Sequence, residues 1–535
     1  MTAPHDDLLR AFARYEDALM GGDVEVLDEL FEDSSETVRS DGGATLVGHG
    51  HISAFRAGRP AAPRRWLERV HVQDVSSDVH RNPVVTVMVA ESVRPDGSTG
   101  VQTQVWRRAE GRWTVMTAHV SSAPPAPAPS LPADADLGAV WRVAPADLEH
   151  GTSAAGRADV PSVARGLPLA GVGIAVKDLF AVAGQRTGAG NPAWLAQAEV
   201  ETVDAAALTS FLTAGAHVEG VAHTDELAFS LAGTNVHHGT PPNAAAPGRI
   251  TGGSTSGPAA AVAAGLADLA LGTDTAGSVR VPASYCGLYG LRTTHDAVSR
   301  AGLVGLAPSF DTVGVLTRGG PLLASAVETL LPEQDVTTVD RLVVVPALLE
   351  LAEPDVRLAV EAALLALSVR TGIPVETAGE VGPGALESWF AAFRTLQQAE
   401  AWETHGAFVQ AHPGAFEPAV EERFLAGSAV TETDVARAQA TITQARTTLA
   451  RLLPHGTVLA LPSTSSVAPR TDAGPAEIDL TRAATLRLTC LASLGGLPAL
   501  SVPTPRVGSL PVGLCLVAAP GQDRTLVDLA TGGTL

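Results

Sequence analysis

Lys177 is the residue of this chain whose type points most directly to chemistry. The 535 residues include 36 Lys and Arg, and Lys177 is the only lysine among them. Arginine stays protonated, whereas a buried lysine can lower its pKa and accept a proton. Lys177 stands in the apolar run Gly173-Ile-Ala-Val-Lys-Asp-Leu-Phe180, which is typical of the end of a buried strand. This position fits a catalytic base and also fits an ordinary lysine with no special role.

Two loops rich in glycine and serine follow farther along the chain. Residues 251–265 begin Thr-Gly-Gly-Ser-Thr-Ser-Gly-Pro and predict a turn that feeds a helix, with Pro258 at the first helical position. Residues 271–282, Leu-Gly-Thr-Asp-Thr-Ala-Gly-Ser-Val-Arg-Val-Pro, predict a strand that ends in a loop of small residues. Backbone N–H groups can converge in such a loop, as an oxyanion hole requires. A single Gly/Ser loop also fits a phosphate loop or a tight turn, although GxxxxGK[ST] is absent from the first loop.

Together these segments resemble the signature of the amidase signature family of serine hydrolases. The resemblance covers roughly residues 137–530. It extends to Tyr285-Cys-Gly-Leu-Tyr-Gly-Leu-Arg292, Ser309-Phe-Asp-Thr-Val-Gly314 and Gly495-Gly-Leu-Pro498. Within the family the chain is similar to the indole-3-acetamide hydrolase branch, through motifs such as His238-Gly-Thr-Pro241 and Phe393-Arg-Thr-Leu-Gln397.

The resemblance implies a Ser–cis-Ser–Lys triad. Lys177 is then the base, Ser254 the cis-serine and Ser278 the nucleophile, and the two serines are 24 positions apart (278 − 254). The N–H groups of Thr275, Ala276, Gly277 and Ser278 are expected to form the oxyanion hole. A serine hydroxyl is a weak nucleophile at neutral pH, so a neutral Lys177 must take its proton through Ser254. This chemistry needs no metal and no cofactor.

The chain departs from the family pattern at a few positions. It has Ser254-Thr-Ser-Gly-Pro258 where Ser-Ser-Gly-Gly-Ser is common, and Ala276-Gly277-Ser278 where Gly-Gly-Ser is common. Thr255 keeps a hydroxyl, and Ala276 causes strain only if its φ must be positive. Burial lowers the Lys177 pKa provided that Asp178 points away or is engaged elsewhere.

Several neighbouring residues allow more than one interpretation. Asp274 and Arg280 flank the nucleophile and fit a loop anchor, a site for a substrate carboxylate or a structural ion pair. His237 and His238 fit substrate contact or a packed loop. Asp311 is expected to cap or pin a turn.

The elements that must position these residues follow from the sequence pattern. Alanine- and glycine-rich helices alternate with short strands at 171–176, 268–272, 341–346 and 457–461, which predicts an α/β domain with a buried sheet. Residues 354–450 are expected to be largely helical, with Trp389, Phe390, Phe393 and Trp402 in the core. The resemblance implies a large α/β amidase signature domain with a mixed central sheet covered by helices.

A Pro/Ala run at 123–134 predicts an extended linker. It divides the chain into an N-terminal domain at 1–122, a linker at 123–136 and the amidase signature domain at 137–535. In the first part, residues 5–31 carry helical spacing, and 83–93, 100–108 and 112–121 alternate like strands, with a tight turn at Glu110-Gly111. A helix layer against a curved antiparallel sheet is the plan of an α+β NTF2-like (SnoaL-like) cone.

This N-terminal part resembles the small NTF2-like proteins that act beside amidases in s-triazine degradation, in the final hydrolysis of carboxylated ureas. The matching stretches include Ala13-Arg-Tyr-Glu-Asp-Ala-Leu19, Thr37-Val-Arg39 and Phe55-Arg-Ala-Gly-Arg-Pro60. The resemblance implies that Tyr15 and Arg39 line a pocket in which Arg39 can grip a carboxylate. A module that only dimerises or stabilises the amidase fits the same residues.

Composition excludes some classes of partner. The net charge is −21, which argues against nucleic acid and anionic membranes because phosphate binding needs a basic face. Cys286, Cys490 and Cys515 lack CxxC or Cys/His spacing, so buried free thiols are expected rather than disulfides or zinc. Without an apolar leader or a long apolar run, a cytoplasmic protein is expected.

The function predicted from the sequence is an amidohydrolase that cleaves an amide or ureido C–N bond of a small molecule and acts as a homodimer. Two alternatives remain open. One is a non-catalytic binding scaffold like the amidase-like receptors of chloroplast protein import. The other is the amidase component of a tRNA-dependent amidotransferase. An arylacetamide and a carboxylated urea are equally compatible with the sequence as substrates.

Overall fold

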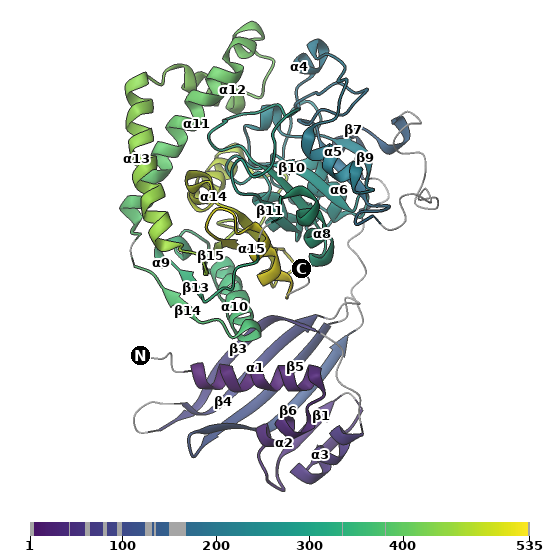
Figure 1. The fold of residues 1–535 in the computed structure, drawn as a ribbon, viewed down its shortest axis with the longest axis vertical. Helices are drawn as coiled ribbons and strands as arrows, with labels where there is room; N and C mark the ends of the chain where they lie inside the picture. Colours follow the sequence, from purple (N-terminus) through teal and green to yellow (C-terminus); the bar gives the residue numbers. More distant parts are fainter. Residues whose placement is uncertain are drawn as a thin grey trace. The chain divides into compact units, whose positions relative to one another are not determined.

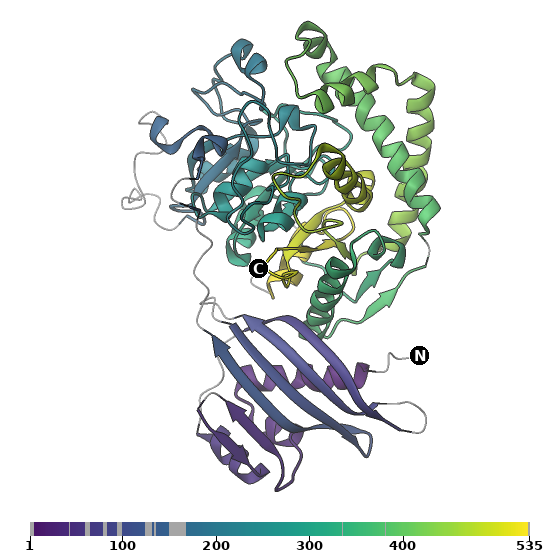
Figure 2. The same ribbon diagram turned by 180° about the vertical axis from the view of Figure 1, so that it is seen from behind.

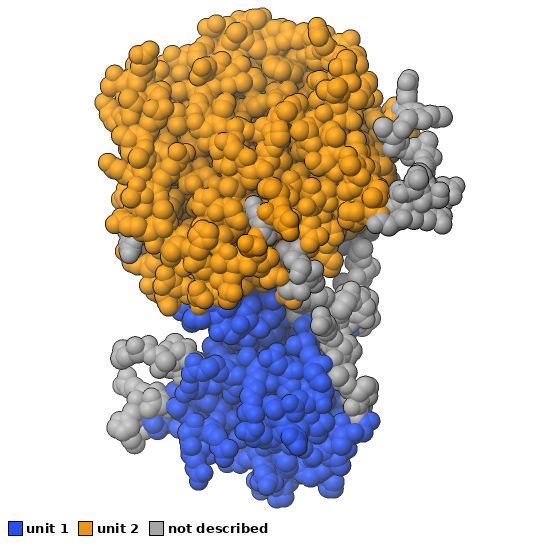
Figure 3. Space-filling model, in the orientation of Figure 1, with its two compact units in different colours: residues 1–128, 361–375 blue, residues 129–360, 376–535 orange. Residues whose placement is uncertain are grey.

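The computed structural model describes residues 5–41, 43–58, 65–78, 83–93, 99–123, 131–132, 135–148, 167–333, 335–379 and 381–532. The chain divides into two compact units, residues 1–128 with 361–375 and residues 129–360 with 376–535 (Figure 3). Most of the expected linker at 123–136 lies outside the described residues. The domain boundaries given above therefore stay a prediction.

The first unit is built on a sheet of six strands in the order β2-β1-β6-β5-β4-β3. Its elements are α1 (Asp6–Gly21), α2 (Val24–Leu30), β1 (Val38–Asp41), β2 (Thr45–Val47), α3 (His49–Ala57), β3 (Trp66–Ser77), β4 (Pro83–Val93), β5 (Thr99–Ala109) and β6 (Arg112–Ala123). Helix α1 crosses one face of this sheet in Figure 1, and Figure 2 shows the strands from the other side.

The expected α+β architecture of this unit is confirmed, with one correction. Gly22 has a φ of 72° and separates α1 from α2, and Glu110 and Gly111 form the turn between β5 and β6 with φ values of 51° and 79°. The sheet is not wholly antiparallel, because β1 pairs with β6 in parallel. Chain segments between these two strands carry β1 back to the same direction, which the alternation of residues within each strand cannot reveal.

The second unit contains a mixed sheet of eleven strands in the order β14-β13-β15-β17-β16-β11-β12-β10-β8-β9-β7. Its strands are β7 (Trp141–Val143), β8 (Gly173–Lys177), β9 (His217–Ala222), β10 (Leu269–Thr273), β11 (Tyr289–Arg292), β12 (Val313–Thr317), β13 (Arg341–Val344), β14 (Val375–Thr377, which the division places in the first unit in part), β15 (Thr457–Pro462), β16 (Ala499–Pro503) and β17 (Gly513–Val517). Every residue of β8, β10, β12, β15 and β17 is buried, as expected of a sheet covered on both faces.

Helices cover this sheet. They are α4 (Pro192–Gln197), α5 (Ala206–Thr213), α6 (Ser256–Ala263), α7 (Arg280–Cys286), α8 (Gly320–Leu330), α9 (Pro346–Leu349), α10 (Pro354–Thr371, shared between the units), α11 (Pro383–Ala411), α12 (Pro418–Ser428), α13 (Glu432–Leu452), α14 (Pro475–Gly495) and α15 (Asp523–Thr531), with 3₁₀ turns η1 (Leu137–Ala139), η2 (Pro145–Asp147) and η3 (Glu226–Ala228). The helical stretch at 354–450 is confirmed, and Trp389, Phe390 and Phe393 are buried while Trp402 packs partly buried against the same core.

Helix α6 shows why its alanines matter. Residues 256–263 are all buried, and Ala259, Ala260 and Ala261 pack in one cluster with Ala175 of β8 and Ala270 of β10. Small side chains let this helix approach the sheet closely. Pro258 is the third residue of α6 and not the first, as the sequence had predicted. The position is tolerated because N–H groups in the first turn have no partner within the helix.

Two further expectations concern the described residues as a whole. All three cysteines are buried and free. No helix in the described part of the chain is long and apolar enough to cross a membrane.

Candidate active site

Lys177 is the last residue of β8 and is completely buried. Its Nζ donates to Ser254 Oγ at 2.8 Å, to Thr273 Oγ1 at 2.7 Å and to Thr255 Oγ1 at 3.2 Å. Thr273 comes from the end of β10, which pairs in parallel with β8. Three hydroxyl groups therefore surround the lysine amine, and within the described residues it forms no ion pair with a carboxylate.

The environment of Lys177 favours the neutral amine. Burial lowers the pKa of Lys177 to about 7, although the carboxylates of Asp225, Asp274 and Asp311 oppose this shift. The neighbouring Asp178 is engaged elsewhere, because it pairs with Arg142 Nε at 2.7 Å and accepts from Gly188 N at 2.9 Å. The condition placed on Asp178 by the sequence is thus met.

Ser254 is held by its own backbone. The peptide bond between Gly253 and Ser254 is cis, as the resemblance had implied. The carbonyl oxygen of Ser254 accepts from Thr224 Oγ1 at 2.8 Å and from Asp225 N at 3.3 Å. A Cβ at position 253 would lie 2.2 Å from Asp225 Oδ2, so only glycine fits beside this carboxylate.

Asp225 is a member of the site that the sequence interpretation missed. It follows β9 after two residues, is fully buried and accepts from Gly233 N at 2.9 Å and from Ser256 Oγ at 3.0 Å. Burial raises its pKa. An aspartate directly after a buried strand, next to Thr224, is the signal that could have found it. Thr273 was missed for a different reason, since only strand pairing brings it to Lys177.

Ser278 lies in the second loop and is buried. Its carbonyl oxygen accepts from Thr255 N at 3.3 Å, which joins the loop of Ser278 to the residue after Ser254. Gly277 precedes it with a φ of +129°, whereas Ala276 is not among the residues of positive φ. The alanine in place of the common glycine therefore causes no backbone strain.

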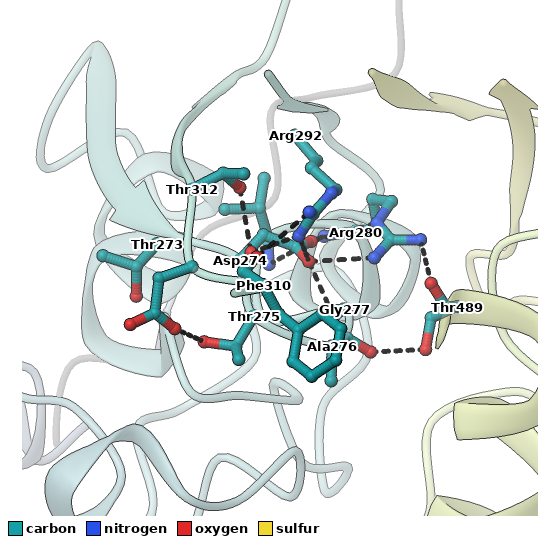
Figure 4. A network of polar contacts seen from close by, with 12 residues as sticks. Thr273, Asp274, Thr275, Ala276, Gly277, Arg280, Arg292, Phe310, Thr312 and Thr489 are labelled. Atoms are coloured by element: carbon teal, nitrogen blue, oxygen red, sulfur yellow. Dashed lines mark hydrogen bonds and ion pairs between the residues drawn. The ribbon is translucent and has the colours of Figure 1, made fainter. Parts of the chain in front are cut away.

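Asp274 organises the loop that carries Ser278 (Figure 4). Its carboxylate accepts from Gly277 N at 2.7 Å, from Arg280 Nε at 3.0 Å and Nη2 at 2.8 Å, and from Arg292 Nη1 at 3.2 Å. Burial alone would raise the pKa of Asp274, but the two guanidinium groups hold it well below its ordinary value. Of the three interpretations left open, the structure favours the loop anchor built on a buried ion pair.

The N–H of Gly277 is a correction to the expected oxyanion hole. Since it donates to Asp274, it is not free to bind a substrate oxygen. Asp311 pins the facing turn by accepting from Leu306 N at 2.8 Å and Ala307 N at 3.0 Å, as expected, and it also accepts from Thr275 Oγ1 at 2.6 Å. The backbone of Thr275 is thereby tied to the body of the domain.

Replacing Asp274 by asparagine is expected to destabilise the fold by about 3–5 kcal/mol, because two buried guanidinium groups lose their only carboxylate at nearly unchanged volume. Urea unfolding of Asp274→Asn beside wild type measures this. Asp472→Asn is the matched control, since the Asp472–Arg470 pair is 69% and 64% exposed and its loss should not change stability measurably. Equal midpoints for wild type and Asp274→Asn would refute the anchoring role.

The two histidines have partners within the protein. His237 Nε2 lies 2.9 Å from Glu226 Oε1, and the ring of His238 stacks on His223 at 3.9 Å between centroids. Burial lowers the pKa of both His238 and His223, that of His223 to about 3. These contacts agree with packed loop residues.

The N-terminal residues Tyr15 and Arg39 are not brought into direct contact. Tyr15 is buried against Phe12 and Trp106, and burial raises its pKa. Arg39 pairs with Asp41 at 3.1 Å and lies 4.8 Å from the centre of the Phe55 ring. The guanidinium that was expected to grip a carboxylate is thus already paired.

A second buried ion pair in this unit was not foreseen. Arg65 donates to both oxygens of Glu16 at 2.9 Å and to Gln102 Oε1 at 3.0 Å. It is enclosed by residues of α1 and β5, whose proximity depends on the sheet and not on sequence neighbours.

Comparison with known proteins adds independent findings. The Amidase family model matches residues 132–360, and the AtzH-like family model matches residues 5–125. Amidase 1 of Arabidopsis thaliana is 33% identical over 390 residues, which cover 68% of this chain and 92% of that protein. Amidase 1 of Oryza sativa subsp. japonica is 32% identical over 396 residues, covering 69% of this chain and 91% of that protein.

A solved structure also resembles the chain. It comes from a vestigial protein complex that bears on the evolutionary origins of an s-triazine catabolic enzyme. It has a TM-score of 0.62 and 29% identity, and it covers 68% of this chain and 83% of its own. The chain belongs to the amidase signature family of hydrolases that act on C–N bonds, and it carries an AtzH-like module at its N-terminal side.

Proposed function

We propose that the protein hydrolyses an amide or ureido C–N bond of a small molecule through an acyl-enzyme on Ser278, with Lys177 as base and Ser254 as the proton relay. The observation that carries this proposal is the 2.8 Å contact between Lys177 Nζ and Ser254 Oγ, at a buried amine whose pKa lies near 7. A base of that pKa is half neutral near physiological pH, which suits proton transfer.

The first half of the reaction forms the acyl-enzyme. Ser254 passes its proton to Lys177 Nζ and takes the proton of Ser278, whose Oγ attacks the carbonyl carbon. The N–H groups of Thr275, Ala276 and Ser278 are assigned to the oxygen of the tetrahedral intermediate. When the C–N bond breaks, the proton returns from Lys177 through Ser254 to the leaving nitrogen.

The second half consumes water. A water molecule attacks the ester carbon and gives a proton to the same relay, and the C–O bond to Ser278 breaks. The relay returns the proton to Ser278 Oγ, and the carboxylic acid leaves. All protons taken by Lys177 are returned within one cycle, so the enzyme is regenerated without a further reactant.

The pH dependence of kcat/KM follows from the state of Lys177. Since the base is the neutral amine, activity should rise with pH through a midpoint of about 7 and fall about tenfold per unit below it. Initial rates of ammonia release in buffers of constant ionic strength measure this profile. A profile that is flat from about pH 5.5 to about 8.5, or one centred near the ordinary lysine pKa, would contradict a neutral Lys177 as base.

The substrate class is open between arylacetamides and carboxylated ureas. A panel of simple amides, arylacetamides and carboxyureas, assayed for ammonia with wild type and Lys177→Ala, tests the proposed function. Turnover of one class by wild type alone supports it. Absence of turnover and of labelling by a fluorophosphonate probe would instead favour a binding scaffold.

We also propose that the AtzH-like module serves assembly as a homodimer. The support is that Arg39 and Arg65 are both paired with carboxylates, which leaves less charge for a ligand. Sedimentation velocity of the full chain measures the mass in solution. A monomer at micromolar concentration would contradict this assignment, and tight binding of a dicarboxylate lost in Arg39→Gln would favour a ligand pocket.

A further inference from the structure

A cavity beside helix α14 contains a guanidinium group that the mechanism above does not use. Its walls include Ile250, Val281, Tyr285, Ile478 and Thr485, and Arg482 completes them. The cavity has a volume of about 10 Å³, enough for one group the size of a water molecule. The lining is mostly apolar, so a charge in it is weakly solvated.

Arg482 has no hydrogen bond or ion pair within the described residues, and its Nε is buried without a partner. Other arginines around the same helix are satisfied. Arg487 donates to both oxygens of Glu387 at 2.8 and 3.1 Å, and Arg423 donates to Phe229 O at 2.8 Å. A buried N–H donor that lacks an acceptor is costly, so an acceptor from outside would be bound favourably.

The charges around Arg482 favour an anion as that acceptor. Burial lowers the pKa of Arg482 to about 9, and the positive charge of Arg423 acts in the same direction. The acid on the preceding turn, Asp479, lies 3.6 Å from Arg423 and is paired there. This local excess of positive charge stands in a chain of net charge −21.

The cavity adjoins the two catalytic loops. Val281 follows Ser278 by three residues, and Ile250 precedes Ser254 by four. On α14, Thr489 Oγ1 donates to Ala276 O in the nucleophile loop. Arg482 stands two turns earlier on the same helix, about 10 Å along its axis at 1.5 Å per residue. A ligand with its carbonyl at Ser278 can therefore place a second group near Arg482 a few bonds away.

We propose that Arg482 binds a carboxylate of the substrate, so that the protein acts on amides or ureides that carry a carboxylate a few bonds from the scissile carbonyl. This inference rests on the proposed function. The planar fork of arginine matches a carboxylate, and a water-sized space accepts a carboxylate oxygen but not an aromatic ring. Between the two classes left open above, it selects the carboxylated one.

The test compares acids with neutral amides of the same length. Malonamate, succinamate and glutaramate are assayed beside propionamide, butyramide and pentanamide, with wild type, Arg482→Gln, Arg482→Lys and the control Arg437→Gln. Arg437 is exposed and pairs with Asp434 on its own helix, so its loss removes one charge at the surface. Circular dichroism and thermal unfolding show which variants fold.

For at least one pair, wild type should prefer the acid, and Arg482→Gln should lower that preference in kcat/KM ten- to a hundredfold, mainly through KM. Arg482→Lys should keep part of the preference because it keeps the charge, and Arg437→Gln should keep all of it. Equal rates for all acids and neutral amides, or an unchanged preference in both Arg482 variants, would overturn the proposal.

Equilibrium binding separates this inference from the proposed function. Calorimetry with Ser278→Ala and succinamate needs no turnover, and binding should be lost in Ser278→Ala/Arg482→Gln. If wild type hydrolyses no amide but this binding pattern holds, the proposed function fails and the carboxylate site stands. If succinamate binds equally with and without Arg482, or does not bind, the carboxylate site fails.

Discussion

Lys177→Met should lower kcat/KM for amide hydrolysis by about 10³-fold or more and leave the fold intact. Methionine fills nearly the same volume and is well suited to a buried position, but it cannot accept a proton. Removal of a general base costs about 10²–10⁴-fold, and here the same group also returns the proton to the leaving nitrogen. Ammonia release gives the rate, and thermal unfolding shows whether the variant is folded.

Lys177→Arg distinguishes the base from the charge. Arginine keeps a cation in the pocket of hydroxyl groups but stays protonated, so this variant should be as inactive as Lys177→Met. A Lys177→Arg protein that retains more than about a tenth of wild-type activity would show that the cation and not the base is needed. Residual activity in Lys177→Met that still rises through a midpoint of about 7 would assign the titration to another group.

Ser278→Ala should abolish turnover by about 10⁴-fold or more, because no acyl-enzyme can form without the hydroxyl. Mass spectrometry after reaction with a fluorophosphonate should find one adduct, on the peptide with Ser278, and none in the variant. Ser299→Ala is the control: Ser299 is an exposed serine whose hydroxyl only accepts from Ala301 N, so rate and adduct should match wild type. An adduct that persists in Ser278→Ala would move the nucleophile to another residue.

Much of the site could be predicted because its signals are local. The single lysine, the two Gly/Ser loops and the apolar strand before Lys177 each lie within a few consecutive residues. The structure places Lys177 Nζ at Ser254 Oγ as the resemblance implied. Strand alternation likewise predicted β4 (Pro83–Val93) with the observed bounds.

The parts that were missed depend on contacts between distant segments. Thr273 reaches Lys177 only because β10 pairs with β8, where Leu271 lies opposite Val176. Asp225 approaches Gly253 through a loop after another strand. The direction of a single N–H group, that of Gly277, depends on the φ of 129° at this residue, which no residue pattern encodes.

The same limit applies to charged residues. Asp274 and Arg280 allowed three interpretations because the sequence does not show that Arg292 shares the same carboxylate. Arg482 is one of 35 arginines (36 Lys and Arg less one lysine), and nothing in its neighbours along the chain shows that its guanidinium lacks a partner. Arg39 looked free in the sequence and is paired with Asp41, two residues farther on.

Helix α14 also determines when the chain becomes active during its synthesis. Thr489 supports Ala276 across 213 positions, and its carbonyl oxygen accepts from Arg280 Nη1 at 2.9 Å. A growing polypeptide that has left the ribosome up to the end of α13 already contains Lys177, Ser254 and Ser278. It lacks the support of the loop that presents the nucleophile. Hydrolysis therefore begins only after nearly the whole chain has been made, and an incomplete translation product ending before α14 is inert.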